Sequence, residues 1–237
     1  MVSESLRSFS REDYYSSITG ERGYMSKDAM DYSLRKALSD GRIVRTGWNR
    51  YALSGEKKVY SHEYSGFSKE LAKDIASTFP EVLFQVFELT QLNSFMNHLI
   101  GRNTIFVSVE NGLESLLFDR LWQRYEGRVM LKPGYEQYSR YYVDDLIVVG
   151  RLPSESPKGF DAPWQIRLER ILVDLATDRL LGRIVPESET DNVFRNAFDS
   201  YLIDADTMVR YAKRKGAGKK ILDTLDRYLP EMNGGRK

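Results

Sequence analysis

The sequence predicts an α+β or α/β fold class, with an N-terminal winged helix-turn-helix followed by an α/β domain that has a mixed sheet and a helical C-terminal part. Three observations lead to this prediction. Helical segments precede two short β-branched or aromatic runs within the first 60 residues, strand and helix patterns alternate over residues 69–149, and helical spacing alone follows from residue 166. We therefore expect two domains, residues 1–60 and residues 61–237.

The helices of the first domain are predicted from caps and apolar spacing. Ser10 with acidic residues after it is typical of a helix start, and we expect this helix to end before Gly20. Ser26 favours a short second helix, and Leu34 and Leu38 predict a third and longer helix that ends at Gly41. Three helices before a hairpin are the order of a winged helix-turn-helix, in which the longest helix enters a major groove of DNA.

Two short runs, residues 43–46 and 51–53, flank a Gly-Trp-Asn-Arg turn and predict the two-stranded wing. Basic side chains on the helix and wing can donate hydrogen bonds to guanine edges and phosphates, and an Asn side chain can pair with adenine. An alternative stays open, in which these cations are the solvated face of a small domain that binds protein. The candidate DNA-binding residues are Ser26, Lys27, Tyr32, Arg35, Lys36, Arg42, Arg45, Trp48, Asn49 and Arg50.

Composition and charge narrow the class of protein. Residues 1–60 hold 11 basic and 8 acidic residues, whereas the remainder holds 24 and 26, so the basic part comes first. There is no cysteine, no apolar run long enough for a membrane span and no pattern of a secretory signal, which leads us to expect a cytoplasmic protein. A second basic cluster, residues 213–220, is interpreted either as a nucleic-acid contact or as a solvated helix end.

The second domain is predicted from alternating patterns. Residues 57–68 are interpreted as a linker or an edge strand. Successive parallel strands need helical crossovers, so the sheet should be at least partly parallel. Strands are expected over residues 82–89, 104–109, 128–131 and 146–149, and helices over residues 69–77, 92–100, 113–125, 166–177, 191–201, 204–213 and 220–229.

We find no convincing catalytic motif and expect neither an enzyme nor a cofactor or metal site. No phosphate-binding Gly-rich loop follows a strand, and none of the acidic residues near strands is followed two positions later by lysine, as a metal-dependent nuclease requires. Glu169 lies on an apolar helix, where it either pairs with Arg167 or Arg170 or meets a partner protein. The candidate partner-binding residues are Glu169, Arg170, Lys213, Arg214 and Lys215.

Three short phrases carry a resemblance to a known family. They are residues 38–41 followed by Ile43, Arg45 and Tyr51; residues 92–96 (LNSFM); and residues 168–175 (LERILVDL). With these phrases the chain resembles, over most of its length, the AbiEi family of abortive-infection antitoxins. The Tyr-rich insertion at residues 135–142 and the turn at Trp48 depart from the family pattern, which leaves the operator and the partner open.

The resemblance implies a DNA-binding antitoxin of a type IV toxin-antitoxin system. Such a protein represses its own operon through the winged helix and counteracts a nucleotidyltransferase-like toxin, with or without a stable complex. The expected partners are therefore double-stranded operator DNA and possibly that toxin, with the oligomeric state open. The alternative is a DNA-targeted enzyme with a degenerate nuclease- or nucleotidyltransferase-like α/β domain.

Overall fold

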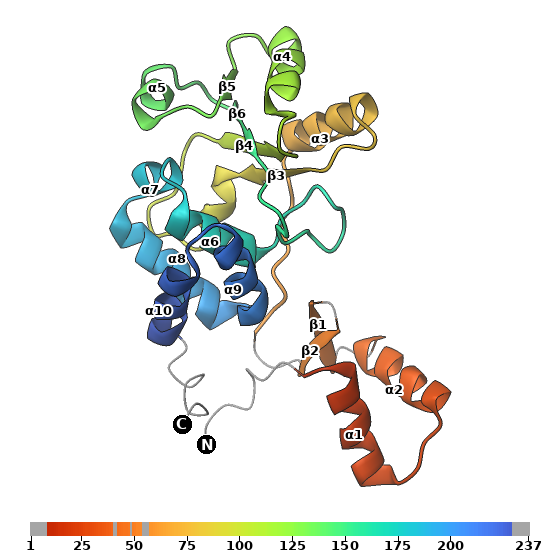
Figure 1. The fold of residues 1–237 in the computed structure, drawn as a ribbon. Coiled ribbons are helices and arrows are strands. Elements are labelled where there is room, and N and C mark those ends of the chain that lie inside the picture. Colours follow the sequence, from red (N-terminus) through yellow and green to blue (C-terminus); the bar gives the residue numbers. More distant parts are fainter. Residues whose placement is uncertain (1–8, 40–41, 48, 54–56, 229–237) are drawn as a thin grey trace. The chain divides into compact units, whose positions relative to one another are not determined.

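A computed structural model describes residues 9–39, 42–47, 49–53 and 57–228 (Figure 1). The chain divides into two compact units. Unit 1 comprises Met1–Tyr60 together with Phe198–Asp204, and unit 2 comprises Ser61–Ala197 and Ala205–Lys237. The return of residues 198–204 to unit 1 was not predicted. It is fixed by backbone hydrogen bonds from Lys58 N to Ser200 O (3.0 Å) and from Leu202 N to Lys58 O (2.9 Å).

Helix α1 (Arg11–Arg22) opens unit 1 with the predicted cap at Ser10. The Ser10 hydroxyl accepts from Asp13 N (3.1 Å), and the Asp13 carboxylate accepts from Ser10 N (2.8 Å). The prediction that Gly20 ends the helix is wrong. Gly23 ends it, because at φ 78° this residue takes a left-handed conformation that favours glycine while its N–H donates to Thr19 O (2.9 Å).

Helix α2 (Lys27–Ser39) replaces the two separate helices predicted between residues 26 and 39. Ser26 caps it by accepting from Ala29 N (3.3 Å), and no residue between Met30 and Tyr32 interrupts the helical hydrogen bonds. In the described residues of the first 53, two helices rather than three therefore precede the hairpin. Gly41, the expected helix end, lies outside the described residues.

The predicted hairpin is confirmed as β1 (Ile43–Gly47) paired antiparallel with β2 (Arg50–Leu53). Phe9 adds an antiparallel bridge to Tyr51, with N···O distances of 2.8 and 2.9 Å. Strand and helix pack together because their apolar residues share a small core. Its buried members are Leu34, Ala37, Ile43 and Tyr51.

Unit 2 contains the mixed sheet that the alternating pattern predicted. Its strands are β3 (Phe84–Glu88), β4 (Thr104–Val109), β5 (Val129–Leu131) and β6 (Leu146–Arg151), in the order β3-β4-β6-β5. β3 is antiparallel to β4, while β6 is parallel to both β4 and β5. Both faces of the sheet are covered, so most positions of its strands are buried, including the polar Gln85, Glu88 and Ser108.

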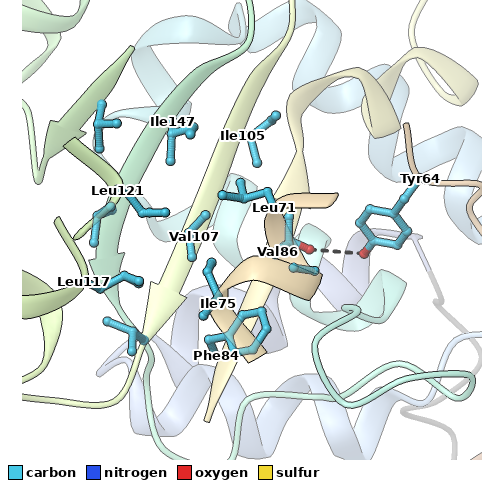
Figure 2. Close-up of a cluster of buried hydrophobic side chains, with 14 residues drawn as sticks. Tyr64, Leu71, Ile75, Phe84, Val86, Ile105, Val107, Leu117, Leu121 and Ile147 are labelled. Carbon is cyan, nitrogen blue, oxygen red and sulfur yellow. Dashed lines mark hydrogen bonds between the residues drawn. The ribbon is translucent and has the colours of Figure 1, made fainter. Parts of the chain in front are cut away.

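One face of the sheet packs against α3 (Gly66–Thr78) and α4 (Glu114–Arg124). Figure 2 shows Leu71 and Ile75 from α3, and Leu117 and Leu121 from α4, against the sheet side chains. Tyr64 also joins this core, where its hydroxyl donates to Val86 O (3.1 Å). Leu116 of α4 is 52% exposed, since the helix turns that position away from the sheet.

The other face meets α5 (Tyr135–Arg140), α6 (Leu168–Thr177) and α7 (Leu181–Ile184). The chain then continues as α8 (Glu187–Ser200), α9 (Ala205–Arg214) and α10 (Gly218–Tyr228), which confirms the helical C-terminal part. In Figure 1 this helical group lies on the opposite side of the sheet from α3 and α4. Within the described ranges, none of the helices has the length and apolar character needed to cross a membrane.

The helix predicted over residues 92–100 is wrong. The structure has a short 3-10 helix, η2 (Leu89–Ser94), followed by irregular chain. The Asn93 side chain explains the difference, because it accepts from Ile100 N (2.7 Å) and donates to Ile100 O (3.1 Å). An Asn amide that pairs with backbone in this way closes a loop in place of helical bonds.

Candidate functional site

Helix α2 carries four of the ten predicted DNA-binding residues, and all four are exposed. Lys27, Arg35 and Lys36 are exposed, and the Tyr32 side chain is 63% exposed. Leu34 and Ala37 lie on the opposite side, buried against the hairpin and α1. The helix therefore presents three cations and an aromatic ring outward while its apolar stripe holds it in place.

Contacts with α1 fix the orientation of α2. The Tyr15 hydroxyl donates to the Asp31 carboxylate, and Arg11 Nη1 lies 3.9 Å from Asp31 Oδ1. Burial and the bond to Asp31 raise the pKa of Tyr15 to about 12, so this phenol stays a donor at neutral pH. Of the two acidic residues of α2, Asp31 therefore contacts α1, whereas Asp28 is exposed near the cations.

Two further residues lie near this helix. Ser26, predicted as a DNA contact, caps α2, and Tyr24, in the loop before it, is 97% exposed. Tyr24 was not predicted, since an aromatic residue in a loop carries no periodic signal. An aromatic side chain left in solvent is uncommon in a folded protein and is typical of contact surfaces.

One residue of the predicted wing, Asn49, is placed differently from the prediction. Asn49 does not face outward as a free amide: it accepts from Arg11 N (3.2 Å) and donates to Glu12 Oε2 (3.0 Å), so it ties the hairpin turn to the start of α1. The hydrogen bond from Asn49 also lowers the pKa of Glu12. The Asn49 amide is therefore engaged within unit 1 and is not a free DNA contact.

The other wing residues are described only in part. Arg42 is exposed. The backbones of Arg45 and Arg50 lie in β1 and β2, but their side chains are not among the described features, and Trp48 lies outside the described residues. The described part of the candidate nucleic-acid interface is therefore α2 with Arg42 and Tyr24, and the contribution of the wing tip stays a prediction.

The predicted partner-binding pair on α6 is buried, which corrects that prediction. Glu169 and Arg170 are each 3% exposed, so neither offers a surface to a partner protein. Glu169 accepts two hydrogen bonds from Arg167, at 3.0 and 2.8 Å, in agreement with the alternative that it pairs within the chain. The physical reason is that α6 lies between the sheet, which Arg170 contacts through Gln85 and Ser108, and α9, so apolar and charged positions alike are covered.

Arg170 is the centre of a buried polar network. Its guanidinium donates to Asp174 Oδ2 (3.1 Å), to Ser108 Oγ (2.7 Å) and to the Gln85 side-chain oxygen. Asp174 Oδ1 also accepts from Lys215 Nζ (2.6 Å) and Tyr211 Oη (2.9 Å). The network thus joins β3, β4, α6 and α9 across the second face of the sheet.

The same network forms one wall of a cavity in unit 2, with a volume of about 650 Å³. Three of the predicted partner-binding residues, Arg170, Arg214 and Lys215, line this one cavity, which their positions in the sequence did not indicate. Lys213 is exposed and does not line it. The charged residues of the lining are Lys132, Arg151, Arg170, Asp174, Asp178, Arg179, Arg214 and Lys215.

The two histidines each pair with a carboxylate elsewhere in unit 2. His62 Nε2 lies 2.8 Å from Glu88 Oε2, and His98 Nδ1 lies 2.6 Å from Glu189 Oε1. Burial raises the pKa of Glu88, but hydrogen bonds from His62 and Ser65 outweigh it and hold the pKa below its ordinary value. Among the described residues, no three histidine or carboxylate side chains are grouped so that they could hold a metal ion.

Comparisons with known proteins identify a family. The model of a family of unknown function, DUF6577, matches residues 29–231. Comparison with curated proteins gave no match. Among solved structures, the RV2827C protein from Mycobacterium tuberculosis is similar over 92% of this chain and 71% of that chain, at 10% sequence identity and a TM-score of 0.36.

Proposed function

The chain belongs to the DUF6577 family of unknown function, and we propose that it binds double-stranded DNA through α2 and represses its own operon. One observation carries the proposal. Lys27, Arg35 and Lys36 are exposed on a helix whose opposite side is fixed in the unit 1 core. A helix held in this way can enter a major groove without reorganising its own contacts.

The dimensions and chemistry of α2 suit this role. Its 13 residues give a length of about 20 Å, enough to lie along a major groove. None of Lys27, Arg35 and Lys36 forms an ion pair with another described residue, so the three can meet phosphates or base edges without breaking a contact. The Tyr32 and Tyr24 side chains offer hydroxyl groups to the phosphate backbone beside them.

The antitoxin part of the proposal is supported by the sequence resemblance to AbiEi antitoxins. It predicts a neighbouring reading frame for a nucleotidyltransferase-like protein that arrests growth when expressed alone. Co-expression of the full chain should restore growth. Continued arrest in the presence of the soluble full chain would contradict the antitoxin role while leaving DNA binding to its own test.

DNA binding is tested by fluorescence anisotropy with a duplex from upstream of the gene. We expect Arg35→Ala and Lys36→Ala each to weaken binding about 3- to 10-fold and to reduce the slope of log K against log salt by about 0.9 per lost phosphate contact. Lys58→Ala is the matched control, because Lys58 is an exposed cation of unit 1 outside α2. Equal affinities and slopes for all four proteins would overturn the proposal.

A further inference from the structure

The cavity in unit 2 exists because two small residues lie side by side on the sheet. Ser108 of β4 is the register partner of Gly150 of β6, and both line the hollow. A Cβ placed on Gly150 would meet no atom within 4 Å, so the space above it is open. Glycine inside a strand costs stability, and it is found where a ligand or another backbone approaches closely.

The lining of the cavity is strongly basic. Six of its charged side chains are cations and two are carboxylates, although the whole chain has a net charge of only +1. Lys132 pairs with Glu114 (2.8 Å) and Arg214 pairs with Glu155, while Arg170 and Lys215 share Asp174. An excess of positive charge therefore remains after these pairs are counted, and a concave wall concentrates its field.

Arg151 and Arg179 supply part of this excess from exposed positions in the lining. Both are exposed, and neither forms an ion pair with any residue in the described part of the chain. Arg151 ends β6, and Arg179 lies in the turn between α6 and α7. Ligands of α/β domains bind outside the carboxyl ends of parallel strands, which is where Arg151 lies.

The uncharged part of the lining is mostly apolar. Phe87 and Phe106 stack at 5.6 Å between ring centroids, and Val148 and Leu180 line the same hollow. A volume of about 650 Å³ lies in the range of small-molecule sites, about 300–1,000 Å³. Duplex DNA has no group that would fill an apolar hollow of this kind, whereas a compact ligand with one charged and one flat apolar part would.

We propose that this cavity binds a nucleotide, with its phosphates on Arg151, Arg179 and Lys215 and its base against Phe87 and Phe106. The Lys215 side chain is 17% exposed, so only a compact group such as a phosphate can contact it. The proposal goes beyond DNA binding, since every lining residue belongs to unit 2 and none to α2. A nucleotide site there would let unit 2 respond to a small molecule.

The test is isothermal titration calorimetry of the full chain with ATP in the presence of EDTA, so that no metal contributes. AMP, adenosine and inorganic triphosphate are titrated in parallel. We expect ATP to bind with a Kd in the micromolar range, and adenosine and triphosphate to bind at least 10-fold more weakly, because each lacks one half of the ligand. Triphosphate that binds as tightly as ATP would contradict the role of the aromatic wall.

Two variants test the site itself. Combined Arg151→Ala and Arg179→Ala should weaken ATP binding at least 10-fold. Gly150→Val should weaken it as well, because the added side chain occupies the open space above Gly150. The matched controls are Lys73→Ala, an exposed cation on the α3 side of the sheet, and Gly101→Val, where added atoms also meet open space. Both controls should keep wild-type affinity.

The double arginine variant keeps the test decisive if Gly150→Val does not fold, because neither arginine forms an ion pair in the described residues. Absence of ATP binding by the wild-type chain at millimolar concentration would overturn the proposal. Equal affinity in the wild type and the double variant would do so as well. Duplex DNA binding by the double variant should be unchanged, which separates this site from α2.

Discussion

Replacing Arg170 by methionine should destabilise unit 2 by about 3 kcal/mol. Breaking a buried ion pair from one side costs about 3–5 kcal/mol. The partners of Arg170 keep other contacts: Gln85 still accepts from Ser156 (2.6 Å), and Asp174 still accepts from Lys215 and Tyr211. The cost therefore falls at the lower end of that range.

Urea unfolding followed by tryptophan fluorescence measures this loss. A Trp48→Phe background leaves Trp122 and Trp164, both in unit 2, as the only reporters. With an m-value of about 2 kcal/mol/M, the midpoint should fall by about 1.5 M urea. Arg195→Met, an exposed position on α8, is the control and should change stability by less than about 0.5 kcal/mol.

The pH dependence gives a second readout of the same network. Burial raises the pKa of the Asp174 carboxyl, but Arg170 and Lys215 outweigh burial and hold it below the ordinary value of 3.8. The stabilisation from this carboxylate is therefore complete above pH 3.8 and is lost as the pH falls further. The difference in free energy of unfolding between the wild type and Arg170→Met should therefore become smaller as the pH falls below 3.8. A midpoint shift no larger than that of Arg195→Met would refute the reasoning.

Three further predictions concern stability. Gly20→Ala should stabilise α1 by about 0.5–1 kcal/mol, since the residue lies inside the last turn of the helix and its added Cβ meets open space. Gly23→Ala at φ 78° should destabilise α1 by about 1 kcal/mol. Opposite shifts in Tm are therefore expected, and shifts of the same sign would contradict the assignment of the helix end. Leu71→Ala should cost about 2–5 kcal/mol in urea unfolding, because the side chain is fully buried between α3 and the sheet, and a loss below about 1 kcal/mol would count against this core. Glu114→Gln should lower the stability by less than about 1 kcal/mol at pH 7, because Lys132, the partner of Glu114, is half exposed. The hydrogen bond from Lys132 lowers the pKa of Glu114 to about 2, so the carboxylate contributes its full stabilisation above pH 4.5. The difference in Tm between the variant and the wild type should therefore disappear as the pH falls toward 2.

Predictions from the sequence succeeded where residues close together in the chain determine the structure of an element. The apolar run of β3, the periodic stripe of α6 and the Ser10 cap each determine their element through nearby residues, and each is confirmed. The predictions failed where the same stretch of sequence is compatible with two local structures. Gly20 and Gly23 are both plausible helix ends, and only the backbone conformation selects Gly23. Residues 92–100 have helical spacing, but the Asn93 side chain closes a loop instead.

The residues of the candidate sites also fall into those that the sequence predicted and those that it did not. The exposed cations of α2 could be predicted because helical spacing alone assigns each residue to a face, and Leu34 marks the buried one. The role of Asn49 could not, since its partner Glu12 is 37 positions away. Charge at Glu169 and Arg170 suggested a surface contact, yet both are buried because other elements cover α6.

The sequence by itself determined the four strands of the mixed sheet, most of the helices and the charge excess of the first 60 residues, because caps, periodicity and helical crossovers act over short stretches of chain. Only the tertiary structure brought Ser108, Gly150, Arg170 and Lys215 to one hollow on the sheet. These residues are separated by up to about a hundred positions, and no local interaction relates them. Their proximity follows from strand order and helix packing, which depend on how distant apolar faces are buried together.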